Sequence, residues 1–180
     1  MAGGGGQDDS TLGREALAYA DALHNLARYL TGDASDADDL VQETYARALR
    51  AAAQFTPGSN LKAWLFRILR NTFLSDLRRR RASPVLGGLD TVIPSAQDAG
   101  ATAWLRDDVE LDRLRRVVAG EIEAALRQLS EDARTVILLD LEGFMEVEVA
   151  DVMGCAVGTV KSRLARARAA LRVQLKDYAR

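Results

Sequence analysis

Apolar residues recur every three or four positions along most of the chain, which is the spacing of an amphipathic helix. Residues 14–30 form the first such segment, and Gly32 follows it, a residue common just beyond a helix end. Ser35 or Asp36 can cap a second helix, and residues 61–80 have the pattern of a third. Apolar and polar positions never alternate for long, and no hairpin turn signal occurs. The pattern predicts an all-α protein.

The helical pattern is absent from two segments. Residues 1–13 begin with a glycine run and are expected to form a disordered tail. Residues 82–103 hold two of the three prolines of the chain, with several glycines, which is typical of a flexible linker. We therefore predict two small helical domains, at residues 14–81 and 104–180, joined by that linker. The linker is long enough for the domains to lie far apart on one partner.

The second domain ends in two helices around a tight turn. Its pattern resumes at Trp104, where Gly120 is expected to interrupt the helix, and Ser130 is expected to cap the next one. Residues 146–153 and 157–178 then form a short and a long helix on either side of Gly154. A helix, a short turn containing glycine and a second helix are the signature of a helix-turn-helix.

The long helix of this motif has two distinct faces at 100° per residue. The inward face is apolar and consists of Val157, Val160, Leu164, Ala167 and Leu171. The outward face carries hydroxyl and basic side chains, with a lysine at its flank: Thr159, Ser162, Arg163, Arg166 and Lys161. Because arginine can bond guanine through two hydrogen bonds, this face suits the major groove of DNA. The alternative interpretation of the pattern is a solvated amphipathic hairpin.

The predicted helix at 61–80 mixes aromatic and basic side chains. Stacking surfaces beside a positive field are what single-stranded nucleic acid requires. The aromatic members are Trp64, Phe66 and Phe73, and the basic members are Lys62, Arg67, Arg70 and the run from Arg78 to Arg81. The loop at 55–60 precedes this helix and could hold an unstacked base. Taken alone, Trp64 and Phe73 fit core packing better than base stacking.

The formal net charge of −2 argues at first sight against a nucleic-acid partner. By segment, however, residues 1–60 carry −5, residues 61–81 carry +6, residues 82–160 carry −9 and residues 161–180 carry +6. Two basic blocks therefore lie in acidic surroundings, which favours a polyanionic partner for both. The acidic second helix would repel DNA, so we expect it to face a different partner.

Other classes of protein are poorly supported. A single cysteine, Cys155, excludes an internal disulfide, and a single histidine, His24, leaves a zinc site without ligands. The glycines at 3–6 lack the lysine of a phosphate-binding loop, and His24 has no nucleophile partner. No membrane span and no secretory signal are present. We expect neither an enzyme nor a cofactor, and we expect no insertion into a membrane.

Three motifs resemble bacterial sigma factors. Residues 38–45 read Asp-Asp-Leu-Val-Gln-Glu-Thr-Tyr, residues 61–68 read Leu-Lys-Ala-Trp-Leu-Phe-Arg-Ile, and residues 157–164 read Val-Gly-Thr-Val-Lys-Ser-Arg-Leu. The short two-domain layout is similar to the extracytoplasmic-function (ECF, group IV) class of the sigma-70 superfamily. The resemblance covers residues 14–81 and 119–175.

The resemblance implies a promoter-specificity subunit of RNA polymerase. The first domain would be region 2, binding the core enzyme and the single-stranded −10 element, and the second would be region 4, binding the double-stranded −35 element. In the family, the second helix docks on a coiled coil of the largest polymerase subunits. The matching positions here are Asp38, Asp39, Gln42 and Glu43. The −10 positions are Asn60, Lys62, Trp64, Arg67, Arg70, Asn71, Arg78 and Arg79. The −35 positions are Thr159, Lys161, Ser162, Arg163 and Arg166.

The resemblance also implies a cytoplasmic protein that joins the nucleoid when active. An anti-sigma factor, often tethered to the membrane, would restrain it by covering the polymerase-binding surfaces. We further hypothesise that the acidic parts of the chain oppose DNA binding until polymerase separates the domains. Tight promoter binding by the isolated chain at physiological salt would contradict this hypothesis.

The chain departs from the family pattern at three places. Leu65 follows Trp64 where primary sigma factors carry a second aromatic residue, so we expect weaker promoter melting. Ala156 stands where proline is common, and Met145-Glu146 where Ser-Tyr is common. The alternative function is a stand-alone helix-turn-helix regulator, which would share the C-terminal motif. Such a regulator would need neither the acidic motif at 38–45 nor the aromatic and basic helix.

Overall fold

The computed structural model describes the backbone of residues 5–82 and 106–176, and the side chains of residues 11–82 and 117–176. Every regular element in these two ranges is helical. The predicted linker at 82–103 lies almost wholly outside the described residues, as does the end of the last predicted helix. No helix of the described ranges is both long and apolar enough to cross a membrane. The prediction of an all-α, two-domain chain is confirmed.

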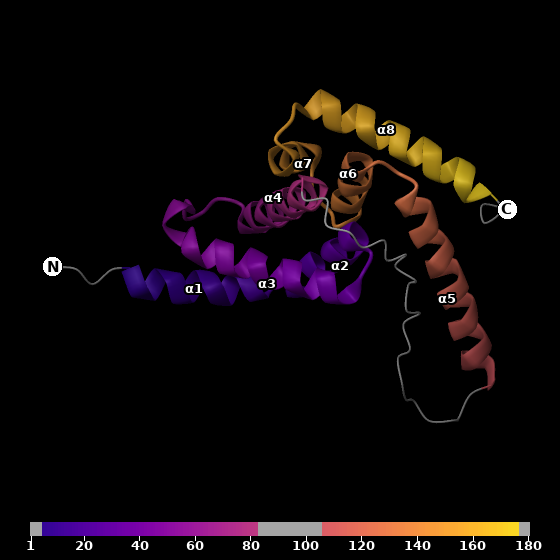
Figure 1. The fold of residues 1–180 in the computed structure, drawn as a ribbon, viewed down its shortest axis with the longest axis horizontal. Helices are drawn as coiled ribbons and strands as arrows, with labels where there is room; N and C mark the ends of the chain where they lie inside the picture. The colour runs from indigo at the N-terminus through magenta and orange to yellow at the C-terminus, as the bar shows by residue number, and fades with distance from the viewer. Residues whose placement is uncertain (1–4, 83–105, 177–180) are drawn as a thin grey trace.

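The helices form two groups that follow one another along the chain (Figure 1). The N-terminal group consists of α1 (Gly5–Leu17), α2 (Ala20–Thr31), α3 (Ala34–Arg50), a 3-10 turn (Ala52–Gln54) and α4 (Leu61–Ala82). The C-terminal group consists of α5 (Arg106–Arg127), α6 (Glu131–Leu141), α7 (Glu146–Met153) and α8 (Val157–Gln174). In the first group α3 packs between α2 and α4, and in the second α6 and α7 both pack against α8.

The N-terminus differs from the prediction. A disordered tail was expected at 1–13, but α1 begins at Gly5, and two helices replace the single one expected at 14–30. Leu12 and Ala16 are buried, on a helix that packs against α3 and α4, and this burial offsets the entropy of ordering the segment. Helix α1 ends at Leu17, and the amide of Tyr19 then donates to the carbonyl of Ala16 in a tight turn that leads into α2.

The helix boundaries follow capping chemistry. The cap of α3 is Asp33, whose carboxylate accepts from the amide of Asp36 at 3.0 Å, and not Ser35 or Asp36 as predicted. Asp33 precedes them and is extended, which leaves its side chain free to turn back onto the first turn. Ser130 caps α6 as predicted. Gly120 does not interrupt α5, which continues to Arg127.

The helix-turn-helix forms at the predicted residues. Gly154 ends α7 with a φ of 62°, a left-handed conformation that a side chain would disfavour. The amide of Cys155 then donates to the carbonyl of Ala150 and closes the turn. At the start of α7, where Met145 offers no capping oxygen, the carboxylate of Glu148 accepts from the Met145 amide at 2.7 Å. The departures from the family pattern at Met145-Glu146 and at Ala156 therefore leave the motif intact.

The two domains pack against each other. α4 lies along α7, and α2 lies against α6 and the end of α5. Phe144, between α6 and α7, meets Phe66 of α4 edge to face, with ring centroids 4.9 Å apart. Both rings are buried, and the buried residues of the two domains form one continuous apolar cluster. The sequence allowed the domains to lie far apart, but in this structure they share a core.

Candidate nucleic-acid and polymerase interfaces

The predicted −35 face is largely open on α8. Lys161, Ser162 and Arg166 are exposed on the outward side, whereas Val160 and Leu164 are buried beneath them. The separation into two faces expected from 100° per residue is therefore confirmed. Lys161 lies 3.5 Å from Glu146. Both partners are well exposed, so a DNA phosphate could compete for the lysine at little cost.

Two members of the predicted −35 set are less accessible. Thr159 is half-buried, and Arg163 turns inward with a side chain that is only 26% exposed. Arg163 lies 2.7 Å from the carboxylate of Asp132 and 3.8 Å from the sulfur of Cys155. Arg163 is therefore not free to reach a base in this conformation. The half-buried Cys155 packs beside it in the turn.

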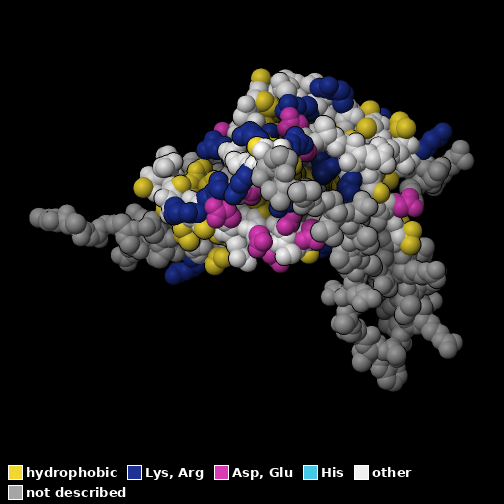
Figure 2. Space-filling view, viewed as in Figure 1, with side chains coloured by type: hydrophobic (Ala, Val, Ile, Leu, Met, Phe, Trp, Pro, Cys, Tyr) yellow, Lys and Arg dark blue, Asp and Glu magenta, His cyan; other side chains and the backbone are white. Residues whose placement is uncertain are grey.

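The predicted −10 face of α4 lies against the C-terminal domain. Figure 2 shows Lys and Arg side chains lying beside Asp and Glu side chains over the middle of the molecule. The ammonium group of Lys62 donates to the carbonyl of Glu142 at 2.8 Å and sits 4.5 Å from the centre of the Phe144 ring. The side-chain amide of Asn60 donates to the Glu148 carboxylate at 2.6 Å. A cation held against an aromatic face and a carbonyl is well satisfied without any external partner.

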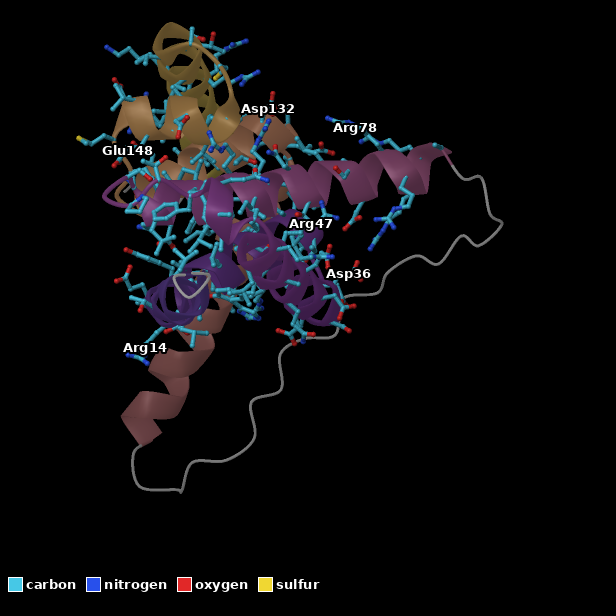
Figure 3. The ribbon with its side chains drawn as sticks, turned by 90° about the vertical axis from the view of Figure 1, so that its left-hand side faces the viewer. Arg14, Asp36, Arg47, Arg78, Asp132 and Glu148 are labelled. Carbon is cyan, nitrogen blue, oxygen red and sulfur yellow. The ribbon has the colours of Figure 1, made fainter. Side chains whose placement is uncertain are left out.

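The arginines of α4 continue this contact with carboxylates. Arg67 lies 3.2 Å from Asp151 of α7, and Arg70 lies 2.9 Å from Asp132 of α6. Arg81 further along the helix lies 3.2 Å from Glu131. Figure 3 shows Glu148 and Asp132 on the α6 and α7 side of the long α4 helix. In this conformation the acidic surface of the second domain therefore occupies much of the predicted −10 face.

The remaining −10 candidates do not join that face. Trp64 is half-buried and packs on Phe55, with ring centroids 5.1 Å apart. It lines an apolar cavity of about 260 Å³ between α1, α3 and α4. Asn71, Arg78 and Arg79 are exposed, and Arg78 lies toward the far end of α4 (Figure 3), where Arg79 pairs with Asp76. The structure thus brings Asn60, Lys62, Arg67 and Arg70 together, but not Trp64.

The predicted polymerase-binding residues share one side of α3. Asp38, Asp39 and Gln42 are exposed and Glu43 is half-buried. Asp38 lies 3.0 Å from the ring of His24, and Glu43 accepts from Arg47 at 2.7 Å. The hydrogen bond from Arg47 lowers the pKa of the Glu43 carboxyl, which stays ionised. Among the residues that the structure describes, Asp39 and Gln42 have no side-chain partner, so both are available to another protein.

A groove of about 600 Å³ runs beside this acidic side, between α3 and the end of α4. Arg134 of α6 reaches one end of the groove and donates to four carbonyls. Three of these carbonyls lie at or just beyond the C-terminal end of α5, and the fourth belongs to Tyr29 of α2, at 3.2 Å. Burial lowers the pKa of the Arg134 guanidinium. Its contacts place a cation at the carbonyl ends of two helices, which is the favourable position.

Sequence reasoning missed the carboxylates of the second domain that meet α4 and the residue before it, which are Glu131, Asp132, Glu148 and Asp151. The charge of −9 over residues 82–160 was the available signal, but it did not say which carboxylates meet which cations. No group of His, Cys, Asp and Glu side chains in the described ranges is arranged to hold a metal ion.

The fold and these surfaces define a two-domain helical protein with a helix-turn-helix and two basic faces. Family models for sigma-70 region 2 and for sigma-70 region 4 match residues 16–83 and 119–171. The chain is 42% identical to the ECF RNA polymerase sigma factor EcfG of Rhodopseudomonas palustris, over 87% of this chain and 81% of the relative. The chain belongs to the ECF sigma factors of the sigma-70 family.

Solved structures support the same assignment. The sigma factor RpoE of Bartonella quintana, in complex with the anti-sigma factor NepR, aligns with a TM-score of 0.68 and 35% identity. That alignment covers 91% of this chain and 95% of the other. CnrH in complex with the cytosolic domain of CnrY aligns with a TM-score of 0.65 and 29% identity, over 96% and 91% of the two chains. Sigma factors act in transcription initiation with RNA polymerase and are not enzymes.

Proposed function

We propose that this sigma factor binds core RNA polymerase through α3 and directs it to promoters with a −10 and a −35 element. The observation that carries the proposal is the presence of two basic helices, α4 and α8, each in a domain that a sigma-70 model matches. The exposed acidic side of α3, which would repel DNA, fits a protein partner. The chain itself contributes no catalytic step.

At the −35 element, the outward face of α8 would enter the major groove of duplex DNA. Lys161 would hold a phosphate, while Ser162 and Arg166 would face the base edges from the first three turns of the helix. Arg166 is exposed, and among the residues that the structure describes its side chain bonds only to the carbonyl of Ser162 in its own helix, at 3.2 Å. Releasing that bond would leave the whole guanidinium fork available for a base.

Arg166→Ala is expected to weaken selectivity for the −35 sequence by about 1–3 kcal/mol, the value of one good base contact. The measurement is transcription by the reconstituted holoenzyme from intact and −35-mutated promoters. Arg172→Ala is the matched control, because Arg172 is exposed in the last turn of the same helix, away from the outward face. Equal transcription by the wild type from both promoters would remove the basis of the prediction.

At the −10 element, α4 and the loop before it would hold bases of the melted strand. Asn60, Lys62, Arg67 and Arg70 offer amide and cationic donors along one side of the helix. Extracting each base from the duplex costs a few kcal/mol, which contacts of this kind can offset. The packing of Trp64 on Phe55 supports a role for this residue in shaping the loop.

An anti-sigma factor is the third partner that we propose. The similar RpoE of Bartonella quintana is bound to the anti-sigma factor NepR. The groove beside α3 lies next to the proposed polymerase-binding residues, so a protein seated there would exclude polymerase. We place the action of the chain in the cytoplasm, at the nucleoid when it is active and near the membrane when such a partner is tethered there.

Run-off transcription with core polymerase over a library of promoter sequences tests the proposal. We expect transcripts only when this sigma factor is added, from promoters that share two sequence elements. DNA binding by the chain without any dependence of transcription on it would instead identify a stand-alone regulator. Sequencing the transcribed promoters would define both elements in the same experiment.

A further inference from the structure

Asp132, in the first turn of α6, pairs with one arginine from the DNA-binding helix of each domain. One carboxylate oxygen lies 2.9 Å from Arg70 of α4, and the other lies 2.7 Å from Arg163 of α8. We propose that Asp132 is an autoinhibitory latch, a single carboxylate that holds both arginines away from DNA in the free protein. This inference rests on the proposed function, because it takes α4 and α8 as the two DNA-binding helices.

The geometry suits a latch because both arginines are poorly solvated. The Arg70 side chain is 12% exposed and the Arg163 side chain 26% exposed, whereas Asp132 is 39% exposed. A guanidinium with little access to water needs an acceptor, and removing the acceptor costs the desolvation free energy of that group. A DNA phosphate offers arginine the same acceptor chemistry as a carboxylate. At Arg70 of α4 a phosphate can replace Asp132 only when the two domains separate, whereas at Arg163, which shares a domain with Asp132, it competes with the carboxylate directly.

The other polar contacts across the domain boundary also pair donors of the first domain with acceptors of the second. Asn60 and Lys62 are held by the Glu148 carboxylate and the Glu142 carbonyl, so the acidic surface takes the place of a polyanion along α4. The Arg67–Asp151 pair is well exposed on both sides and contributes little, because water and salt screen it. Among the ion pairs of α4 with the second domain, Arg70–Asp132 is the least exposed, so its removal should have the largest effect.

The polymerase-binding side of α3 stays accessible in this closed arrangement. Asp39 and Gln42 are exposed, and the contacts of Asp132 are made by α4 and α8. Core polymerase can therefore dock on α3 before the domains open. Opening would then be linked to holoenzyme assembly, and the free sigma factor would be kept off non-specific DNA.

The test is the full-length Asp132→Asn variant, in which the amide keeps the size but loses the charge. Its NH₂ group must also face one of the two arginines, which repels that cation. Without polymerase, we expect this variant to bind fluorescein-labelled oligo(dT) and mixed-sequence duplex DNA roughly tenfold more tightly than the wild type, about 1.4 kcal/mol. Its radius of gyration in small-angle scattering is expected to increase.

Asp140→Asn is the matched control. Asp140 lies on the same helix and pairs at 2.7 Å with Arg168 of α8, so both partners belong to one domain. This variant also releases an arginine, but it breaks no contact between domains. We expect its radius of gyration to stay at the wild-type value and its DNA affinity to change far less than that of Asp132→Asn.

Two results would overturn the latch. If Asp132→Asn matches Asp140→Asn in both DNA affinity and size, Asp132 does not hold the domains closed, while run-off transcription by the wild type tests the proposed function separately. If the variant expands but binds DNA no better, the freed arginines do not contact DNA. That second result would contradict the assignment of α4 and α8 as DNA-binding helices. In that case the wild-type holoenzyme should also lack promoter-specific run-off transcription.

Discussion

Asp39→Arg is expected to abolish co-purification of this sigma factor with core RNA polymerase while leaving its helical content unchanged. Asp39 is exposed on α3, and it has no side-chain partner among the described residues, so its reversal should not disturb the fold. The neighbouring Asp38, Gln42 and Glu43 make this side of α3 acidic. A polymerase surface that binds this acidic side of α3 must be basic. An arginine at position 39 would then face like charges, which cost several kcal/mol when juxtaposed.

Glu15→Arg is the control for this charge reversal. Glu15 is an exposed acid near the end of α1, where a cation is favourable, and it precedes the residues that the region 2 model matches. Pull-down with tagged core polymerase, together with circular dichroism, compares the two variants. Undiminished assembly of Asp39→Arg would show that α3 does not carry the polymerase contact.

Phe66→Ala is expected to lower the free energy of unfolding of the free chain by about 3–5 kcal/mol. The Phe66 ring is fully buried and packs edge to face on Phe144 of the other domain. Alanine would remove the Phe66 ring from the domain boundary, leaving a cavity and an unmatched Phe144. The ammonium group of Lys62, 5.8 Å from the Phe66 ring, would also lose an aromatic neighbour.

Denaturant unfolding followed by circular dichroism measures this loss. Leu141→Ala is the control, because Leu141 is 72% exposed at the end of α6 and its truncation should change the free energy by less than about 0.5 kcal/mol. A Phe66→Ala variant as stable as this control would mean that the shared core between the domains is not formed in solution.

The periodicity of the sequence predicted most helices, but not α1 or the cap of α3. α4, α6 and α7 begin at the expected residues, because polar caps and glycine turns act within a few positions. The cap of α3 was misassigned because three candidates, Asp33, Ser35 and Asp36, lie within four residues and only the backbone conformation selects among them. α1 was missed because its stability comes from packing on α3 and α4, and not from its own glycine-rich sequence.

In the candidate sites, too, the sequence predicted what one helix determines by itself but not what depends on a second helix. The outward face of α8 was predictable, because one helix determines which of its side chains share a side. The inward turn of Arg163 was not, because it depends on Asp132, a residue on another helix. Trp64 packs on Phe55, a neighbour that only the structure supplied, and its assignment to the −10 positions stays a prediction.

The sequence by itself determined the all-α class, the helix-turn-helix, the segregation of charge and the sigma-factor motifs. Each of these depends on residues close together in the chain or on composition alone. Only the tertiary structure decided that the acidic second domain covers the basic α4 helix. Asn60 and Glu148 are 88 positions apart, and Arg70 and Asp132 are 62 apart. Such pairings follow from how amphipathic helices bury their apolar faces together, which the order of residues along any single helix does not specify.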